Sequence, residues 1–326
     1  MTIAAMELES ASEIPAGSDW LYEPKWDGFR CIAFRDGDAV VFDSKSGKKL
    51  DRYFPEVVAN LKALVAERFV LDGELAIPSG DGFSFDDLQQ RIHPAASRVE
   101  RLARETPARY IVFDLLVDER GEAMASRPLA ERRVALEAFA ARFFTTPDVV
   151  LSPATRSLDE ARAWLAASDA TRDGVVAKRL SLPYRSGDRT GGMKIKRIRT
   201  ADCIVGGYRS NTAGDAVGSL LLGLYDPNGE LDYVGFTSGF STAEKRELLP
   251  RLRALAAPSS FTRRVPGGPS RWKPDAETTW HPLRPELVLE VAFDQVTAGR
   301  MRHGARPLRW RPDKEPRACT TDQLTS

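Results

Sequence analysis

A short segment near the start of the chain, Lys25-Trp26-Asp27-Gly28-Phe29-Arg30, contains residue types suited to covalent chemistry. It follows an apolar run at 20–24 that predicts the end of a strand, so the lysine lies where a strand terminates. A carboxylate follows two residues later, and the glycine after it lets the chain turn sharply. A lysine attacks only as the free amine and from a fixed position. The segment therefore predicts a lysine nucleophile, although a surface hairpin turn at Asp-Gly would contain the same residues.

Two further patches place acids and an aromatic ring on predicted strands. Residues 71–75 end a strand with Glu74, whose carboxylate suits a ribose hydroxyl or a metal; a plain hairpin turn is the alternative. Residues 112–116 form an apolar strand with one acid, in which Phe113 is suited to stacking on a base. An ordinary core strand has the same pattern.

Residues 173–178 predict another strand that contains both an acid and an amine. Asp173 and Lys178 are five positions apart, so their side chains are expected on opposite faces. Asp173 is then free to face a metal or a nucleotide, and Lys178 has some other role, such as solvation.

Two basic pairs follow. Lys194 and Lys196 are two positions apart and share one strand face. Like charges side by side repel, so this pair destabilises the folded protein unless an anion binds between the two lysines. Arg311 and Lys314 form a second pair near the end of the chain.

The elements that hold these residues form two groups. Over the first two-thirds of the chain, strands are expected at 29–34, 39–43, 69–77, 109–117, 173–180 and within 193–208, and helices at 53–65, 84–92, 96–105, 128–143 and 158–167. This order predicts an α+β domain of antiparallel sheets and helices. After about residue 204, a hairpin at 220–236, a helix at 242–255 and strands at 286–296 and 306–311 predict a small β-barrel such as an OB-fold.

The bulk composition is that of an ordinary globular protein, with a formal net charge of +1 over 326 residues. Basic residues are clustered, with nine against two acids over 178–209 and seven against two over 300–317. Such clusters suit a polyanion, or are only solvated faces. Three scattered cysteines without a Cys-x-x-Cys pair argue against a zinc site and favour a reducing, cytoplasmic setting. Neither a signal peptide nor a membrane-spanning stretch is predicted.

In this order and at this spacing, the patches resemble the nucleotidyltransferase motifs of the ATP-dependent DNA ligases over nearly the whole chain. Lys-x-Asp-Gly is the nucleotidyl-lysine pattern that these ligases share with mRNA capping enzymes. Segments 85–94, 199–208 and 302–314 look most like the small bacterial ligases called ligase C. Those are related to the ligase module of the bacterial end-joining ligase D.

The resemblance implies a fold and a reaction. It implies an ATP-grasp-like nucleotidyltransferase (adenylation) domain at 1–203 and an OB-fold domain at 204–326, with a hinge near residue 200 that lets the domains close over ATP. Lys25 would attack the α-phosphorus of ATP and form lysyl-AMP. AMP would then pass to the 5′-phosphate of a DNA nick, and the 3′-hydroxyl would displace it.

The resemblance also implies roles for single residues. Catalytic roles would belong to Lys25, Lys194, Lys196, Arg311 and Lys314, the last two orienting the leaving pyrophosphate. ATP would be bound by Glu23, Pro24, Arg30, Glu74, Phe113, Asp173, Lys194 and Lys196. The nick 5′-phosphate would be bound by Arg30 and Lys45, and Mg²⁺ or Mn²⁺ by Glu74 and Asp173.

The chain departs from the family pattern at three places. The fourth motif begins with Asp173 where the family usually has glutamate, which is one methylene longer. Lys45 replaces an arginine of the usual Ser-Arg-x-Gly and lacks its bidentate fork, which puts the strength of this DNA contact in doubt. The N-terminal arm, residues 1–18, lacks the usual Pro-Met-Leu segment, and no role is predicted for it.

Other classes of function remain as alternatives. An RNA ligase or a GTP-using capping enzyme would share the lysine motif, and a non-catalytic DNA-end-binding module would use the lysines only to grip phosphate. For a DNA ligase, the expected partners are nicked double-stranded DNA and, in trans, a repair polymerase or end-binding proteins. We expect a monomer that acts in DNA repair, in the cytoplasm and on the nucleoid when bound to DNA.

Overall fold

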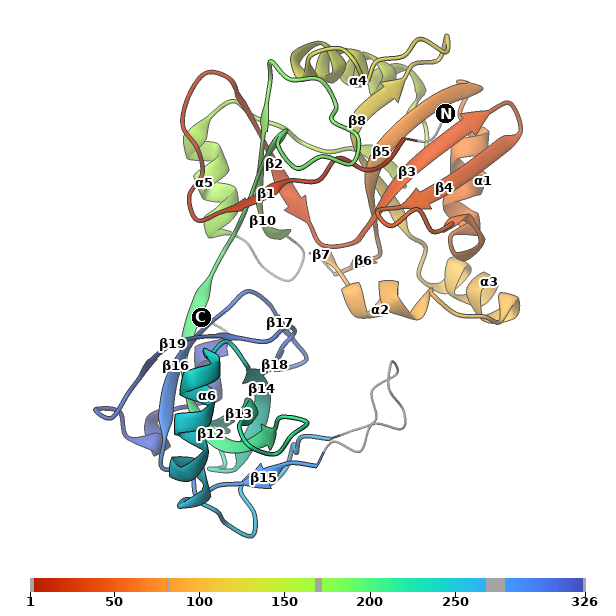
Figure 1. The fold of residues 1–326 in the computed structure, drawn as a ribbon. Coiled ribbons are helices and arrows are strands. Elements are labelled where there is room, and N and C mark those ends of the chain that lie inside the picture. Colours follow the sequence, from red (N-terminus) through yellow and green to blue (C-terminus); the bar gives the residue numbers. More distant parts are fainter. Residues whose placement is uncertain (1–2, 81, 168–171, 268–278, 325–326) are drawn as a thin grey trace. The chain divides into compact units, whose positions relative to one another are not determined.

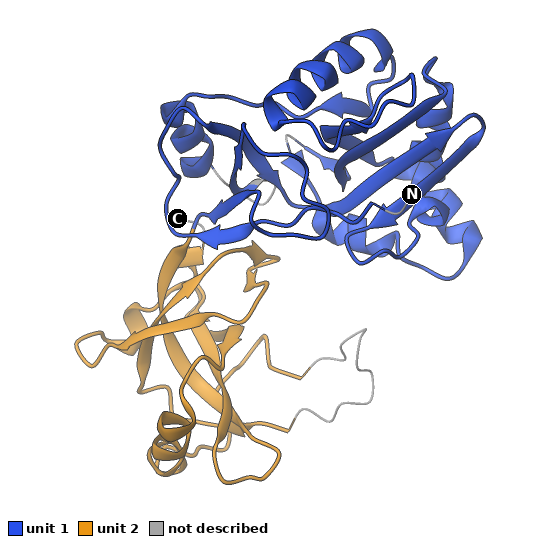
Figure 2. Ribbon diagram, turned by 45° about the horizontal axis from the view of Figure 1, so that its top comes forward, with its two compact units in different colours: residues 1–197 blue, residues 198–326 orange. Residues whose placement is uncertain are grey.

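The computed structural model describes residues 3–80, 82–167, 172–267 and 279–324. The chain divides into two compact units, residues 1–197 and 198–326 (Figure 2). From the sequence, the boundary between the two predicted domains is expected near residues 200–207. Each unit has its own hydrophobic core.

The larger sheet of the first unit has five strands, in the order β4 (Ala39–Ser44), β3 (Phe29–Asp36), β5 (Arg68–Ala76), β8 (Arg109–Val117) and β9 (Val149–Leu151) (Figure 1). All neighbours are antiparallel except β8 and β9. Helices α1 (Pro55–Ala63) and α4 (Leu129–Phe143) contribute Leu61 and Phe139 to the core of this sheet. Strand β8 is buried throughout residues 110–116, so both of its faces are covered.

The second sheet of this unit has four strands, in the order β1 (Glu9–Ala11), β11 (Gly192–Lys196), β10 (Arg172–Arg179) and β2 (Trp20–Trp26). Strand β10 is antiparallel to both neighbours, and β1 is parallel to β11. Helix α5 (Leu158–Ala166) covers the sheet through Ala161, which packs with Tyr22 and Val175. This sheet holds Lys25, Asp173 and both lysines of the 194–196 pair, so its pairing sets their geometry.

The second unit is built on a six-stranded antiparallel sheet. Its order is β14 (Leu231–Thr237), β13 (Val217–Tyr225), β12 (Arg199–Ser210), β16 (Val288–Phe293) and β19 (Arg306–Trp310), and β15 (His281–Pro282) also pairs with β12. Helix α6 (Thr242–Arg253) begins with a capping box in which the Ser241 hydroxyl accepts from the Glu244 N–H and the Glu244 carboxylate accepts from the Ser241 N–H. The hairpin β17 (Val296–Thr297) and β18 (Arg300–Met301) completes the strands of this unit.

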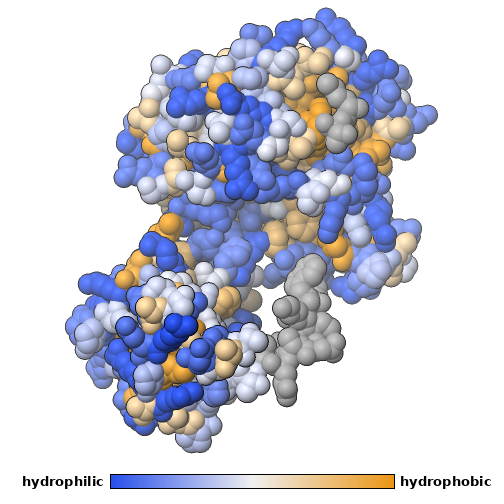
Figure 3. All heavy atoms as spheres, viewed as in Figure 1, coloured by the Kyte–Doolittle hydropathy of each residue, from blue (hydrophilic) through white to orange (hydrophobic). Residues whose placement is uncertain are grey.

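The remaining elements are short. They are β6 (Pro78–Ser79), β7 (Gly82–Phe83), α2 (Phe85–Gln90), α3 (Ala96–Glu105) and the 3₁₀ turns η1 (Asp51–Tyr53), η2 (Pro316–Ala318) and η3 (Thr321–Leu324). Hydrophilic residues dominate the face shown in Figure 3, with apolar residues in patches among them. Within the described parts of the chain, no helix is long and apolar enough to cross a membrane.

The expected mixture of antiparallel sheets and helices is confirmed. Each predicted helix is present within a few residues of its expected bounds. The predicted strand at 286–296 is shorter, because β16 ends at Phe293 and a separate two-residue strand begins at Val296. The short strands β1 and β9 were not predicted, because each has only three residues and too little sequence to show a period.

Candidate active site

A cavity of about 240 Å³ lies in the first unit. Eight of the residues assigned to the site from sequence line it: Glu23, Pro24, Lys25, Arg30, Lys45, Glu74, Phe113 and Lys194. They come from both sheets of the unit and from the segment that follows β4. The structure therefore brings together residues separated by up to 171 positions in the chain, since 194 minus 23 is 171.

Lys25 lies at the cavity in contact with a buried carboxylate. Its Nζ is 2.5 Å from Oδ2 of Asp173, and Nζ of Lys196 is 3.0 Å from the same oxygen. The Asp173 side chain is 4% exposed and that of Lys25 is 20% exposed. Asp173 thus binds two ammonium groups. For Lys196, one lysine of the predicted pair, the anion is therefore a carboxylate of the protein itself. Burial, together with the positive charges of Lys45 and Lys25, lowers the pKa of Lys194.

A β-bulge in β10 places Asp173 against Lys25. Gly174 pairs with Lys25 and Arg172 pairs with Trp26, so Asp173 is an extra residue without a partner on β2. The extra residue interrupts the alternation of side chains along the strand. The prediction that Asp173 and Lys178 face opposite sides is therefore wrong, because both contact residues that line the same cavity.

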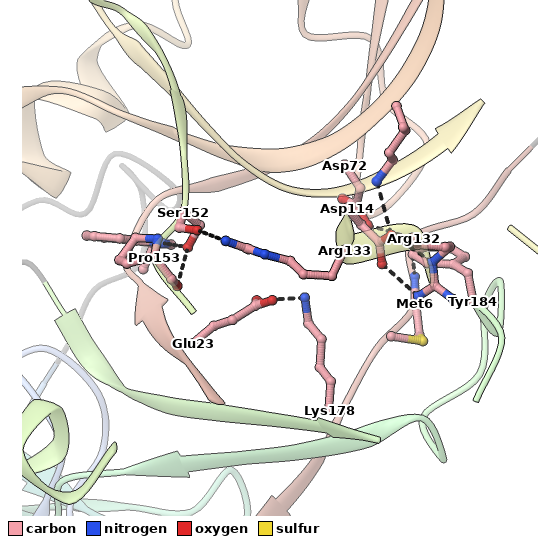
Figure 4. A network of polar contacts seen from close by, with 12 residues as sticks. Met6, Glu23, Asp72, Asp114, Arg132, Arg133, Ser152, Pro153, Lys178 and Tyr184 are labelled. Carbon is pink, nitrogen blue, oxygen red and sulfur yellow. Dashed lines mark hydrogen bonds and ion pairs between the residues drawn. The ribbon is translucent and has the colours of Figure 1, made fainter. Parts of the chain in front are cut away.

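Lys178 is buried, so solvation, the example that the sequence analysis gave for its role, does not apply. Its Nζ is 2.7 Å from Oε2 of Glu23 and 4.5 Å from the centroid of the Phe113 ring. Figure 4 shows the Glu23 and Lys178 side chains pointing toward each other. The second oxygen of Glu23, Oε1, is buried without a hydrogen-bond partner in the described structure. Because Glu23 lines the cavity, a buried acceptor without a partner lies in the cavity wall.

Arg30 is fixed by a buried acid. Its Nε and Nη2 donate to the two carboxylate oxygens of Asp72 at 2.5 and 2.6 Å, and Asp72 is fully buried. The Tyr184 hydroxyl donates to Asp72 at 2.6 Å and accepts from the backbone N–H of Met6 at 2.8 Å (Figure 4). The Arg30 guanidinium also lies 4.3 Å from the Phe113 ring centroid. Asp72 belongs to the predicted patch at 71–75, but that patch was assigned on Glu74 alone.

Glu74 accepts a hydrogen bond from the backbone N–H of Gly28 at 3.2 Å. Burial raises the pKa of Glu74 to about 7. A Cβ at Gly28 would lie 2.2 Å from the backbone oxygen of Leu75. The glycine of the Lys-x-Asp-Gly motif is therefore needed because β5 passes so close, in addition to the turn that the sequence predicts.

The N-terminal arm contributes to the cavity wall, although no role is predicted for it from sequence. Residues 5–8 line the cavity. Oε2 of Glu7 is 3.1 Å from Nζ of Lys45 and 3.1 Å from Nε of Arg189. The hydrogen bond from Lys45 lowers the pKa of Glu7. The sequence signal that could have indicated this contact is that residues 1–18 contain three glutamates and no lysine or arginine.

The remaining predicted residues, Arg311 and Lys314, lie in the second unit. Nη1 of Arg311 donates to Asp202 at 2.9 Å, and Nζ of Lys314 is 3.6 Å from the same carboxylate. Among the residues that the structure describes, no group of three or more His, Cys, Asp or Glu side chains is arranged to hold a metal.

Comparison with known families gives two matches that together cover most of the chain. Residues 4–196 match the ATP dependent DNA ligase domain, and residues 213–314 match the ATP dependent DNA ligase C terminal region. The chain belongs to the ATP-dependent DNA ligase family. The resemblance drawn from the sequence motifs is confirmed.

Relatives and solved structures agree with this assignment. The chain is 43% identical to DNA ligase C2 of Mycolicibacterium smegmatis, over 99% of this chain and 94% of the relative. It is also 43% identical to DNA ligase C of Mycobacterium tuberculosis, over 99% of this chain and 93% of the relative. The crystal structure of the ligase domain of M. tuberculosis LigD is 28% identical, with a TM-score of 0.51 over 98% of both chains. The chain is therefore a DNA ligase by family, similar to the bacterial ligase C proteins.

Proposed function

We propose that the protein seals nicks between a 5′-phosphate and a 3′-hydroxyl in double-stranded DNA, with ATP as the source of AMP. The observation that supports this most strongly is the position of Lys25, at the cavity and 2.5 Å from Asp173 of β10, with Lys194 and Lys196 on β11, which pairs with β10. Lys25 attacks the α-phosphorus, a nitrogen–phosphorus bond forms, and the bond to pyrophosphate breaks. AMP passes to the 5′-phosphate of the nick, and attack by the 3′-hydroxyl releases it.

Residues that line the cavity are suited to binding the base and the ribose of ATP. The unpaired Oε1 of Glu23 is an acceptor suited to the amino group of adenine, a group that guanine lacks at the same position. We assign Phe113 and Pro24 to the face of the base, and Glu74 and Arg30 to the ribose hydroxyls. An acceptor without a partner at this place favours ATP over GTP, because a carbonyl facing Glu23 would leave two acceptors opposed.

Lys194 and Lys196 act on the α-phosphate, where their charge stabilises the transition state. Asp173 holds Lys25 in place while it is an ammonium, and Lys25 must lose its proton before it attacks. Asp173 and Glu74 would hold a Mg²⁺ or Mn²⁺ ion as its few protein ligands, since Mg²⁺ is commonly bound by one or two carboxylates and substrate phosphates. When bound, such an ion supplies positive charge beside the α-phosphate and competes with ammonium groups for Asp173.

The proposal also assigns roles to residues of the second unit and to residues that bind DNA. Arg311 and Lys314 orient the leaving pyrophosphate, and Arg30 and Lys45 bind the 5′-phosphate of the nick. We assign residues 1–203 to an adenylation domain and 204–326 to an OB-fold domain, joined by a hinge near residue 200. We further propose that the protein works as a monomer in cytoplasmic DNA repair and meets polymerases or end-binding proteins in trans.

The first test is covalent labelling. Wild-type protein incubated with ATP radiolabelled at the α-phosphate and Mg²⁺ should retain label after denaturation, because the phosphoramidate is covalent. Lys25→Ala should give no label, whereas Lys62→Ala, a lysine of α1 outside the cavity, should label like wild type. Label on Lys25→Ala would refute the assignment of the nucleophile. Label from GTP but not ATP would point to the capping-enzyme alternative.

A further inference from the structure

Arg311 and Lys314 share one carboxylate partner within the second unit. Nη1 of Arg311 donates to Oδ1 and Oδ2 of Asp202 at 2.9 and 3.1 Å, and Nζ of Lys314 is 3.6 Å from Oδ2. The two cations lie on one turn, in which the Lys314 N–H donates to the Arg311 carbonyl at 3.2 Å. Two positive side chains this close repel each other, and an acid between them removes the repulsion.

The sheet places a second acid directly beside Asp202. Asp202 of β12 faces Glu290 of β16 as a Cα pair. Like charges directly opposite each other destabilise a sheet unless cations lie over them. Here Arg309 binds Glu290 at 2.6 Å, while Arg311 binds Asp202 and lies 3.8 Å from Glu290. Each acid thus forms an ion pair with a different arginine, and the partner of Arg311 is Asp202.

Asp202 is also held firmly by its backbone. On one side it pairs with β16, and on the other its N–H donates to Oε1 of Gln323 at 2.8 Å. Nε2 of the same glutamine donates to the Asp202 carbonyl at 3.2 Å. The Asp202 side chain is 12% exposed, whereas Asp313, the other acid that binds Arg311, is 64% exposed. Asp202 is therefore the fixed partner of Arg311, and Asp313 is a partner that solvent reaches freely.

We propose that Asp202 is the positioning residue that holds Arg311 and Lys314 ready for the pyrophosphate of ATP. This inference rests on the role proposed above for those two cations. It assigns Asp202 to the step that forms lysyl-AMP. The two later steps, transfer of AMP to DNA and closure of the nick, involve no pyrophosphate and do not depend on Asp202.

The test compares Asp202→Asn with Glu290→Gln, which removes one charge from the facing acid. Two rates are measured for each variant and for wild type: formation of lysyl-AMP over a range of ATP concentrations, and sealing of a nick that already carries AMP on its 5′-phosphate. Misplacement of a group that orients the leaving phosphates should slow the first rate about 10- to 100-fold in Asp202→Asn. Its rate on the pre-adenylylated nick should stay within about two-fold of wild type, as should both rates of Glu290→Gln.

Two further variants separate positioning from folding. Asp202→Glu keeps the carboxylate and should recover part of the lost rate. Adding Asp202→Asn to Arg311→Ala should cause a smaller loss of lysyl-AMP formation than Asp202→Asn causes in wild type, because only its action through Lys314 is left. A merely structural role predicts instead that both rates of Asp202→Asn fall together.

Three results would overturn the inference: equal loss of both rates in Asp202→Asn, unchanged lysyl-AMP formation, or faster formation, which would mean that Asp202 restrains the cations. Wild-type protein serves to separate this inference from the proposed function. If wild type forms no lysyl-AMP, the proposed function itself is wrong. If wild type forms lysyl-AMP and Asp202→Asn forms it at the same rate, only the role proposed for Asp202 is wrong.

Discussion

At the scale of single residues, several cations of the candidate site already contact carboxylates before any ligand is bound. Asp173 holds Lys25 and Lys196, Glu23 holds Lys178, and Asp72 holds Arg30. Ordering a long basic side chain costs up to about 2 kcal/mol of rotamer entropy, and in these pairs that cost is met on folding rather than on ligand binding. Substrate phosphates must therefore exchange with carboxylates that are already in place, rather than enter a site of bare positive charge.

Glu74 provides a pH test at this scale. Its pKa is raised by burial to about 7, so it holds its proton more tightly in the folded protein than in the unfolded chain. Through this group the folded state is favoured at acidic pH, and that contribution is lost as the pH rises through about 7. Only the ionised form is a charged acceptor for ribose hydroxyls. An ionised acceptor strengthens such a hydrogen bond by about 1 kcal/mol, or about five-fold in affinity.

We therefore expect the contribution of Glu74 to nucleotide affinity to increase as the pH rises through about 7. The measurement is the Kd of an ATP analogue with a methylene between the α- and β-phosphorus, compared between wild type and Glu74→Gln. Lys194, with its lowered pKa, loses charge at higher pH and acts in the opposite direction in both proteins, so the ratio of the two Kd values isolates Glu74. A ratio that does not change with pH would contradict the assignment.

At the scale of elements, the β-bulge at Asp173 shows what the sequence pattern could and could not predict. Apolar runs indicated β10, β5 and β8 correctly, because a run of apolar residues is a local property of the sequence. A bulge depends on the register between two strands that are distant in the chain, and no local period reveals it. The same reason applies to β1, whose parallel pairing with β11 brings the arm of residues 5–8 to the cavity.

Gly174 gives the prediction at this scale. Its φ is +146°, and a Cβ would lie 2.0 Å from the backbone oxygen of Ile195. Gly174→Ala should therefore destabilise the protein by several kcal/mol or displace Asp173 from Lys25, because a backbone atom cannot move aside as a side chain can. Gly37→Ala is the control, since Gly37 has φ of +59° but no atom within 4 Å of the new Cβ; it should lose only about 1 kcal/mol. Thermal unfolding measures both, and equal losses would refute the close-approach explanation.

At the scale of the whole molecule, basic residues are concentrated in two segments of the chain, although the net charge is close to zero. The net charge is only +1, yet nine basic residues fall within 178–209 and seven within 300–317. In the structure the first cluster includes Lys194 and Lys196 beside the cavity, and the second includes Arg311. The family assignment followed from the order of motifs along the chain. The acids that bind these basic residues, such as Asp72 and Asp202, were not identified as partners, because ion pairs between distant segments appear only in the fold.

Nick sealing by the whole protein is the most direct test of the proposed reaction. The substrate is a duplex with one nick that carries a 5′-phosphate, and ATP, GTP and NAD are supplied separately with Mg²⁺ or Mn²⁺. We expect a sealed strand with ATP alone, and none with Lys25→Ala or with a 5′-hydroxyl at the nick. Sealing with NAD or GTP in place of ATP, or sealing by Lys25→Ala, would contradict the proposed reaction.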